Sequence, residues 1–437
     1  MILSQLTHAP KKFGAPGGIR TPNLLIRSQM LYPLSYGRMA EMTGFEPADL
    51  VKGQLLSREP QSATLAHLQT GLQITHNHAS NQNPATLDLR TMIRADLAAI
   101  PPYVPGTSDP EALKLSSNEV TGAPLPTAVE AMTQAAAGAN RYPDMGASTL
   151  INALARHLGV EPSNVALGCG SSALCQQLAQ ATSLPGNSIV FPWRSFEAYP
   201  IFARICGAEP RPVPLLIDGH LDLPAILSAI DDTTSLVFIC TPNNPTGAVV
   251  TADEFAEFMA QVPPHVTVAL DEAYFEFNRD PNAVNGQEIW REYPNVVCLR
   301  TFSKAYGLAG VRVGYAFGNA ELITAMNKVG VPFQVNSVAQ AGALASLKHA
   351  DELLARVEDT VDVRDEVADH IGAQHSQANF VWLPAPDPEW APRIAAQLAA
   401  HGVLTRAFPE GLRITVTNRD EAAEFLSAWD VVSSTQS

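Results

Sequence analysis

Short apolar runs alternate with amphipathic stretches along most of this chain. The runs are rich in Val, Ile and Phe: SIVF at 188–191, SLVFIC at 235–240, VTVAL at 266–270 and NVVCL at 295–299. Such runs predict buried β-strands. Residues 251–262 have a helical period instead, and Thr251 with Glu254 three residues later is typical of a capping box. Strands that alternate with helices predict an α/β fold with a doubly wound, mostly parallel sheet.

From about Leu344 the pattern predicts a smaller α+β domain. Residues 376–384 and 411–417 look like its strands, and residues 391–402 look like a helix that ends at a glycine. We therefore expect four parts: an extension at 1–91, an arm at 92–122 that packs across the site, a large α/β domain at 123–343 and a small C-terminal α+β domain at 344–437.

Residues 1–91 lack any sustained helical or alternating period and are predicted to be disordered. They carry eight basic and five acidic residues, so the net charge of −15 comes from the rest of the chain. Prolines at 10, 16, 22 and 33 argue against the amphipathic helix of a transit peptide. His76 and His78 are interpreted as solvated rather than metal-binding. The segment resembles translated non-coding DNA, and we expect the native start at Met92.

Composition narrows the class of function. The chain has 437 residues, 46% of them apolar, which is typical of a globular protein with a large core. A net charge of −15 argues against nucleic acid and anionic membrane as main partners. No apolar run approaches the length of about 18 residues that a membrane span needs. The five cysteines show no zinc-ligand spacing and no CxxC pair, which favours reduced thiols and a cytoplasmic location.

Polar and ionisable residues follow the predicted strands, where ligands bind in a doubly wound sheet. TPNNPTG follows the strand at 235–240, DEAYFEF begins with Asp271 after the strand at 266–270, and TFSKAYGLAGVR, with Lys304 and Arg312, follows the strand at 295–299. GCGSS opens a helix at 168–172 and is suited to phosphate. A lysine there suits Schiff-base formation. With the carboxylate as partner of a pyridinium nitrogen, pyridoxal 5′-phosphate fits these groups.

The order PNNPTG, DEAY and TFSKAYGLAGVRVGY resembles the fold-type I pyridoxal-phosphate aminotransferases, in the histidinol-phosphate and aromatic amino acid branch. The resemblance covers residues 92–429 and is nearest to the aromatic amino acid aminotransferases. It implies that Lys304 forms the Schiff base and moves the substrate proton, and that Asp271 pairs with the ring nitrogen. It further implies cofactor contacts from Tyr274, Asn244, Phe196, Thr301, Ser303, Arg312, Gly170, Ser171 and, in a homodimer, Tyr142 lent to the neighbouring subunit.

The same resemblance implies that the substrate is held by Arg413, Asn118, Arg406 and Tyr103. From the residues alone, Phe196 could equally be core, Arg413 an exposed strand arginine, and Asn118 and Tyr142 turn residues. Trp193, Phe196 and Tyr199 are expected beside the pocket, where they would stack on an aromatic ring. We therefore expect transamination of Phe, Tyr or Trp with 2-oxoglutarate. The alternatives are a histidinol-phosphate aminotransferase, a pyridoxal-phosphate lyase and a transcription regulator, although residues 1–91 show no helix-turn-helix pattern.

Overall fold

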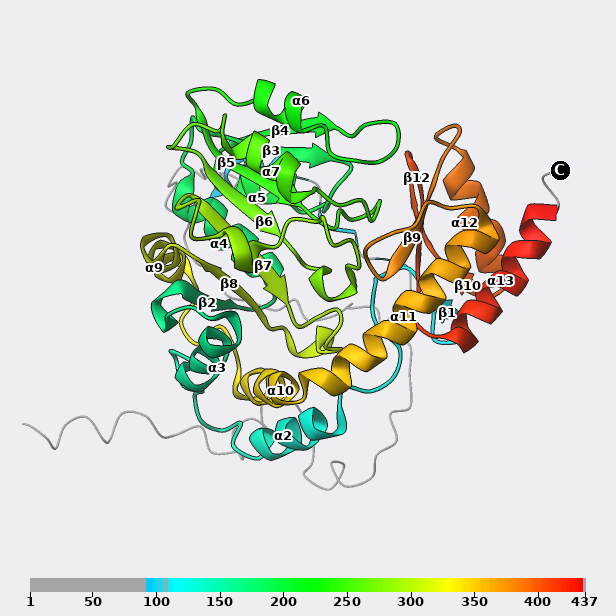
Figure 1. The fold of residues 1–437 in the computed structure, drawn as a ribbon, viewed down its shortest axis with the longest axis horizontal. Helices are drawn as coiled ribbons and strands as arrows, with labels where there is room; N and C mark the ends of the chain where they lie inside the picture. The colour runs from blue at the N-terminus through cyan, green and yellow to red at the C-terminus, as the bar shows by residue number, and fades with distance from the viewer. Residues whose placement is uncertain (1–91, 101, 105, 107–108, 435–437) are drawn as a thin grey trace, which may run out of the picture. The chain divides into compact units, whose positions relative to one another are not determined.

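A seven-stranded sheet forms the centre of the computed structural model, which describes residues 92–434 except 101, 105, 107 and 108. Residues 1–91 lie outside the described residues. The predictions made for them, namely disorder, a native start at Met92 and two solvated histidines, therefore stay predictions. The strand order is β2-β8-β7-β6-β5-β3-β4 (Figure 1). The bounds are β2 Val165–Gly168, β3 Ser188–Trp193, β4 Glu209–Pro214, β5 Thr234–Cys240, β6 Thr267–Asp271, β7 Val296–Thr301 and β8 Gly314–Gly318.

The sheet is mostly parallel, as predicted. Strands β7, β6, β5, β3 and β4 run parallel to one another, and β8 is antiparallel to both of its neighbours, β7 and β2. Each of the four apolar runs became a strand of this sheet. Their continuous hydrophobicity has a physical reason, because both faces are covered. In β5, Val237 and Ile239 join the core on one face, whereas Leu236 and Phe238 join the core on the other.

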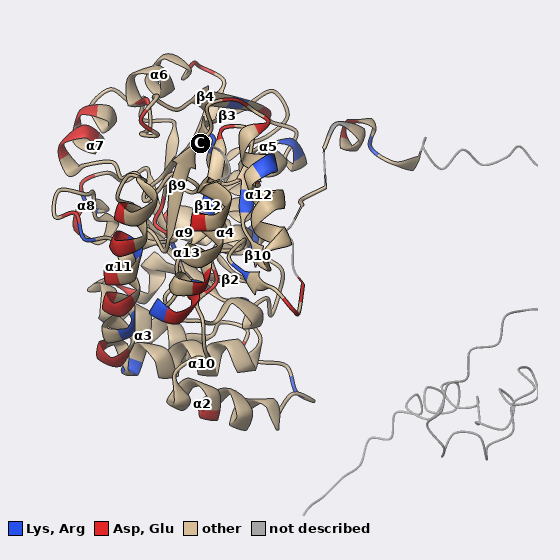
Figure 2. Ribbon diagram, turned by 90° about the vertical axis from the view of Figure 1, so that its right-hand side faces the viewer, with Lys and Arg blue, Asp and Glu red and all other residues tan. Residues whose placement is uncertain are grey.

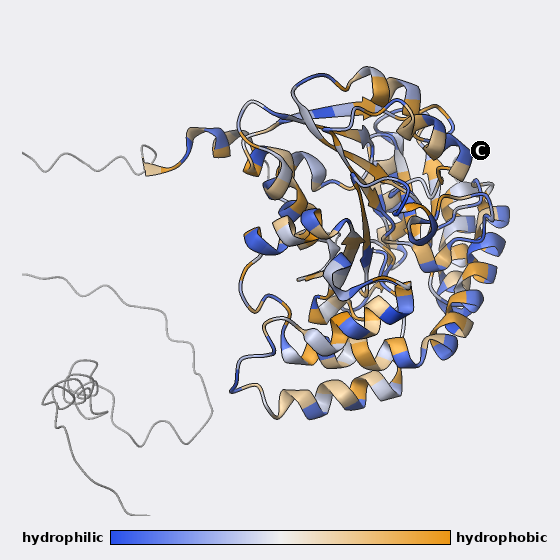
Figure 3. Cartoon of the chain, turned by 60° about the vertical axis from the view of Figure 1, so that its left-hand side comes forward, coloured by the Kyte–Doolittle hydropathy of each residue, from blue (hydrophilic) through white to orange (hydrophobic). Residues whose placement is uncertain are grey.

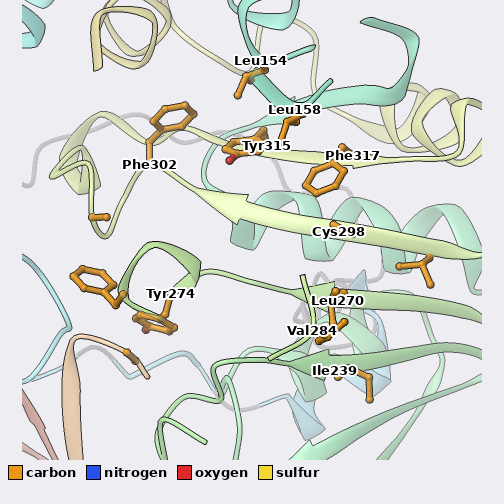
Figure 4. Packing of buried hydrophobic residues seen from close by; sticks show 14 of the residues in the cluster. Leu154, Leu158, Ile239, Leu270, Tyr274, Val284, Cys298, Phe302, Tyr315 and Phe317 are labelled. Carbon is orange, nitrogen blue, oxygen red and sulfur yellow. The ribbon is translucent and has the colours of Figure 1, made fainter. Parts of the chain in front are cut away.

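Helices cover both faces, which confirms the doubly wound arrangement. One face packs against α4, α5 and α9, and the other against α3, α6, α7 and α10. Figure 4 shows Ile239, Leu270, Cys298 and Phe317, which come from neighbouring strands and belong to the core that includes α3, α6, α7 and α10. The capping box is present at the start of α7. The bounds are α2 Pro126–Ala136, α3 Ser148–Leu158, α4 Ser171–Thr182, α5 Tyr199–Ile205, α6 Leu223–Ser228, α7 Ala252–Met259, α8 Gly286–Ile289, α9 Ala320–Val329 and α10 Ser337–Lys348.

The remaining elements form a smaller layered structure at the C-terminal end. An antiparallel sheet of order β11-β12-β9 and a parallel pair β1-β10 pack with α11, α12 and α13 around a third core (Figure 1). Both strands and the helix predicted after residue 344 are present. The bounds are β1 Leu113–Lys114, α11 Ala350–Ile371, β9 Phe380–Pro384, α12 Trp390–Ala400, β10 Val403–Leu404, β11 Arg406–Phe408, β12 Gly411–Thr415 and α13 Arg419–Ser434.

Acidic residues outnumber basic ones in the chain, 43 to 28. Figure 2 shows acidic residues grouped on α7 and α11, and Figure 3 shows central strands that are mostly hydrophobic between helices of mixed character. No described helix is both long and apolar enough to cross a membrane. The five cysteines are free thiols. Within the part of the chain that the structure describes, no cluster of His, Cys, Asp and Glu could hold a metal ion.

Candidate active site

The carboxyl ends of β5, β6 and β7 open into one pocket of about 600 Å³. Parallel strands bring their ends to the same edge, so the residues that follow them meet there. Asn244 comes from the turn after β5, Asp271 ends β6, and Lys304 follows β7. The residues before β1 and just after it, including Tyr103 and Asn118, line the same pocket. Its volume is that of a typical cofactor or small-molecule site.

Asp271 is a buried carboxylate with one oxygen occupied and one open. Its Oδ2 accepts a hydrogen bond from the Tyr199 hydroxyl at 2.7 Å, and the Cys175 thiol lies 3.9 Å from the same oxygen. Its Oδ1 is buried without a hydrogen-bond partner in the described part of the chain. Burial raises the pKa of Asp271 to about 6, while the Tyr199 hydrogen bond favours the charged form. The open oxygen is therefore suited to a donor on a bound ligand.

Lys304 presents its amine in the same pocket. Nζ donates to the backbone oxygens of Ser117 and Asn118, both at 3.2 Å. Burial, together with the positive charges of Arg413 and Arg312, lowers the pKa of Lys304 to about 7, against an opposing effect of Glu119. The lowered pKa favours the neutral amine near neutral pH. A neutral amine is the form that acts as a nucleophile or a base.

A cationic cradle lies where α4 begins. Gly170 has a φ of 82°, and a Cβ at this position would overlap the Arg312 guanidinium. Arg312 donates to the Ser303 hydroxyl at 3.3 Å and to the Ala309 carbonyl at 2.9 Å. Ser171 is the first residue of α4 and lines the pocket. A helix N-terminus, hydroxyl groups and an arginine together suit a phosphate group.

Tyr274 and Asn118 connect the large-sheet side of the pocket to the smaller sheet. Asn118 Nδ2 donates to the Tyr274 hydroxyl at 2.8 Å. The Thr415 hydroxyl of β12 donates to Asn118 Oδ1 at 3.1 Å and accepts from the Asn118 backbone N–H at 2.9 Å. The Tyr274 ring packs edge-on against Phe380 of β9, with centroids 5.1 Å apart. The two sheets are thus linked at the pocket by a buried, well-partnered hydrogen-bond chain.

Two arginines come from the smaller sheet. Arg413 Nη1 donates to Asn244 Oδ1 at 2.5 Å, and Nη2 donates to the Ser116 carbonyl at 2.7 Å. Its Nε is buried and has no partner among the described residues. Arg406 lies opposite Arg413 in the β11-β12 register and is paired with Glu197 at 2.8 Å. An arginine with an unused buried donor suits a carboxylate ligand.

Comparison with known proteins identifies the family. Residues 110–428 match aminotransferase class I and II. An aromatic amino acid aminotransferase of Corynebacterium diphtheriae is 63% identical over 340 residues, which are 78% of this chain and 99% of that protein. This chain belongs to the class I and II aminotransferases. An aromatic amino acid aminotransferase of Corynebacterium glutamicum is 61% identical to this aminotransferase, again over 78% of this chain and 99% of that protein.

A solved structure supports the same family assignment. The histidinol-phosphate aminotransferase of Sinorhizobium meliloti, in complex with pyridoxal 5′-phosphate, is 29% identical and has a TM-score of 0.70. The match covers 75% of this aminotransferase and 92% of that chain. Aspartate aminotransferase of Thermus thermophilus, with 24% identity and a TM-score of 0.64, shows the fold alone.

The pocket of this aminotransferase brings together most residues that the sequence singled out. Thirteen of them line it: Tyr103, Asn118, Ser171, Phe196, Asn244, Asp271, Tyr274, Thr301, Ser303, Lys304, Arg312, Arg406 and Arg413. Gly170 lies beside the guanidinium of Arg312. Tyr142 lies outside the pocket, is 83% exposed, and stacks on Phe333 with centroids 4.7 Å apart.

The prediction that three aromatic residues lie beside the pocket was wrong for two of them. Phe196 lines the pocket, whereas Trp193 and Tyr199 do not. Tyr199 points into the core, where its ring stacks on Phe238 and its hydroxyl reaches Asp271. The apolar wall of the pocket is formed instead by three residues of α5, Ile201, Phe202 and Ile205.

For two residues near this aminotransferase's site, the sequence did not reveal the role that the structure indicates. Tyr199 was recognised only as an aromatic neighbour, although it is the hydrogen-bond partner of Asp271. Glu197 was not singled out, although it lines the pocket and pairs with Arg406. Its position next to Phe196 was the only signal in the sequence, because its partner lies 209 residues away.

Proposed function

We propose that this chain is a pyridoxal 5′-phosphate-dependent aromatic amino acid aminotransferase that uses 2-oxoglutarate as the partner acid. The observation that carries the proposal is the open oxygen of buried Asp271 in the same pocket as the Lys304 amine. A ring nitrogen that carries a proton would satisfy Asp271 Oδ1, and an aldehyde would react with Lys304. The cradle around Gly170 would hold the phosphate.

The residues present fit this cofactor group by group. Arg312, Ser303, Thr301, Gly170 and Ser171 would hold the phosphate. Tyr274 and Asn244 would contact the phenolic oxygen, and Phe196 would pack against the ring. When bound, the cofactor supplies an electron sink for the pair of electrons left when the substrate Cα–H bond breaks.

Lys304 would carry the proton. In its neutral form, which its lowered pKa of about 7 favours, the amine removes the proton from Cα of the amino acid. Arg413, with its unused Nε, would hold the substrate carboxylate and so fix the orientation of Cα. Asn118, whose backbone oxygen accepts from Lys304, positions the amine. The amino donor and the 2-oxo acid would use the same pocket in turn, which predicts ping-pong kinetics.

The aromatic preference has two supports. The pocket wall formed by Phe196, Ile201 and Phe202 is apolar and suits a phenyl, phenol or indole ring. In addition, relatives named aromatic amino acid aminotransferase are 61–63% identical, whereas the histidinol-phosphate aminotransferase is 29% identical. Arg406 and Tyr103 in the pocket favour the alternative, a histidinol-phosphate aminotransferase.

We also infer a cytoplasmic homodimer and the division into arm, large domain and small domain given above. The position of Tyr142 is consistent with the dimer, since the residue lies outside the pocket of its own chain and is 83% exposed although its ring stacks on Phe333. The separate third core supports a distinct C-terminal domain. Sedimentation of the purified chain tests the dimer.

The deciding experiment is a side-by-side measurement of kcat/KM for phenylalanine and histidinol phosphate. We expect phenylalanine to be preferred, with phenylpyruvate as the product. A preference for histidinol phosphate of tenfold or more, about 1.4 kcal/mol of transition-state binding, would replace the aromatic assignment by the alternative. Release of CO₂ from the substrate in place of a 2-oxo acid would establish a lyase.

A further inference from the structure

Two positive charges face each other in the smaller sheet. Arg406 of β11 is directly opposite Arg413 of β12, and both line the pocket. Like charges at opposed positions of an antiparallel pair repel one another. Burial lowers the pKa of the Arg413 guanidinium, and the charge of Arg406 acts in the same direction, against the opposing effect of Tyr274. A counter-charge is therefore needed close to one of them.

Glu197 supplies this counter-charge from the large sheet's side of the pocket. Its Oε2 lies 2.8 Å from Arg406 Nη2, which also donates to the Val104 carbonyl at 3.0 Å. The side chains of Arg406 and Glu197 are 15% and 29% exposed, so the pair is partly shielded from water. Glu197 stands between Phe196 and Ala198, which also line the pocket. The carboxylate is thus part of the wall that a substrate tail meets.

We propose that Glu197 is a specificity-determining residue, which neutralises Arg406 and so makes the side-chain subsite accept uncharged aromatic rings and disfavour phosphate-bearing tails. The inference rests on the proposed function, because it concerns the side-chain subsite of the same site. With Glu197 in place, the pair has no net charge. A phosphate dianion that approached Arg406 would also approach the Glu197 carboxylate, which is 2.8 Å from the guanidinium and repels a second anion.

The ion pair between Glu197 and Arg406 also gives Arg406 and Arg413 different roles. Arg406 already has a carboxylate partner, whereas Arg413 has a buried Nε that lacks one among the described residues. An amino acid that enters the pocket therefore finds in Arg413 an arginine without a carboxylate partner among the described residues. Its side chain meets the neutral pair and the apolar wall of Ile201 and Phe202. This arrangement gives a single binding orientation for an amino acid with an uncharged ring.

Glu197→Gln tests the proposal, because it keeps the size of the side chain and removes its charge. In single-turnover reactions with the amino donor alone, we expect the kcat/KM ratio of histidinol phosphate to phenylalanine to rise tenfold or more. The matched control is Glu410→Gln, which breaks another carboxylate–arginine pair, with Arg194 at 2.9 Å, outside the pocket. The control should keep the ratio of the unchanged protein. An unchanged ratio in Glu197→Gln would overturn the proposal.

Two further measurements separate charge from shape. Glu197→Asp keeps the charge and should keep the ratio; a rise as large as in Glu197→Gln would overturn the proposal. 3-Phosphonopropionate and 3-phenylpropionate, tested as inhibitors of the unchanged holoenzyme, need no variant, because both carry the carboxylate for Arg413 and differ only in the tail. We expect 3-phosphonopropionate to bind more weakly, and equal or tighter binding would overturn the proposal. If the unchanged protein prefers histidinol phosphate, the proposed function fails, but the change in ratio caused by Glu197→Gln still tests Glu197 separately.

Discussion

Replacing Tyr199 with phenylalanine tests how the buried carboxylate of Asp271 is kept charged. The Tyr199 hydroxyl donates to Asp271 Oδ2 at 2.7 Å, and the ring stacks on Phe238 with centroids 4.2 Å apart. Tyr199→Phe removes the hydroxyl and keeps the stacked ring. The charged form of Asp271 then loses its hydrogen bond, so the pKa of Asp271 should rise above its value of about 6.

The size of the effect follows from the energy of that hydrogen bond. A hydrogen bond to a charged group contributes about 1.5–3 kcal/mol, and one pKa unit corresponds to about 1.4 kcal/mol, so the rise should be about one to two units. At pH 6 the charged fraction of Asp271 should fall about 5- to 50-fold in the variant, whereas at about pH 8.5 it should fall less than about twofold. Only the charged form can pair with a protonated ring nitrogen. The affinity for pyridoxal 5′-phosphate should therefore fall at pH 6 and be nearly restored at pH 8.5.

The assay is an equilibrium titration of the cofactor-free protein with pyridoxal 5′-phosphate at several pH values. Tyr315→Phe is the matched control, because Tyr315 is also buried but lies outside the pocket. Equal affinities of Tyr199→Phe and the unchanged protein at pH 6 would refute the reasoning. A loss of affinity that is the same at pH 6 and pH 8.5 would also refute it, since Tyr199 would then act on the shape of the site.

Lys304→Ala should abolish both transamination and the visible absorbance of the bound cofactor; a purified variant that retained either would show that another group acts as the base. Because the pKa of Lys304 is lowered to about 7, the rate at which cofactor-free protein captures pyridoxal 5′-phosphate should rise with pH up to about 7 and then level off. A rate that continued to rise towards pH 10 would mean that the amine is not perturbed. A chain that begins at Met92 should fold and transaminate like the full chain, because 78% of this chain matches 99% of a relative. Loss of solubility or turnover on truncation would contradict this.

The strands and the residues at their ends could be predicted because both depend on local pattern. The apolar run before Asp271 became β6, and Asp271 ends it at the pocket. The partners of these residues could not be predicted, because they come from distant parts of the chain. Tyr199 and Asp271 are 72 residues apart. Whether an aromatic residue such as Tyr199 faces the pocket or the core depends on how α5 packs on the sheet, which spacing alone does not reveal.

Burial shifts the pKa values of Asp271 and Lys304 in opposite directions, because it favours the neutral form of each side chain. It raises the pKa of Asp271 to about 6 and lowers that of Lys304 to about 7. Both pKa values are therefore moved towards neutral pH, so the arrival of a charged ligand group can change the protonation state of either side chain. A protonated ring nitrogen at Asp271 Oδ1 would stabilise the carboxylate. Two buried atoms of pocket-lining residues lack a partner among the described residues, Asp271 Oδ1 from the large sheet and Arg413 Nε from the small sheet. This implies that cofactor and substrate complete different sides of one pocket.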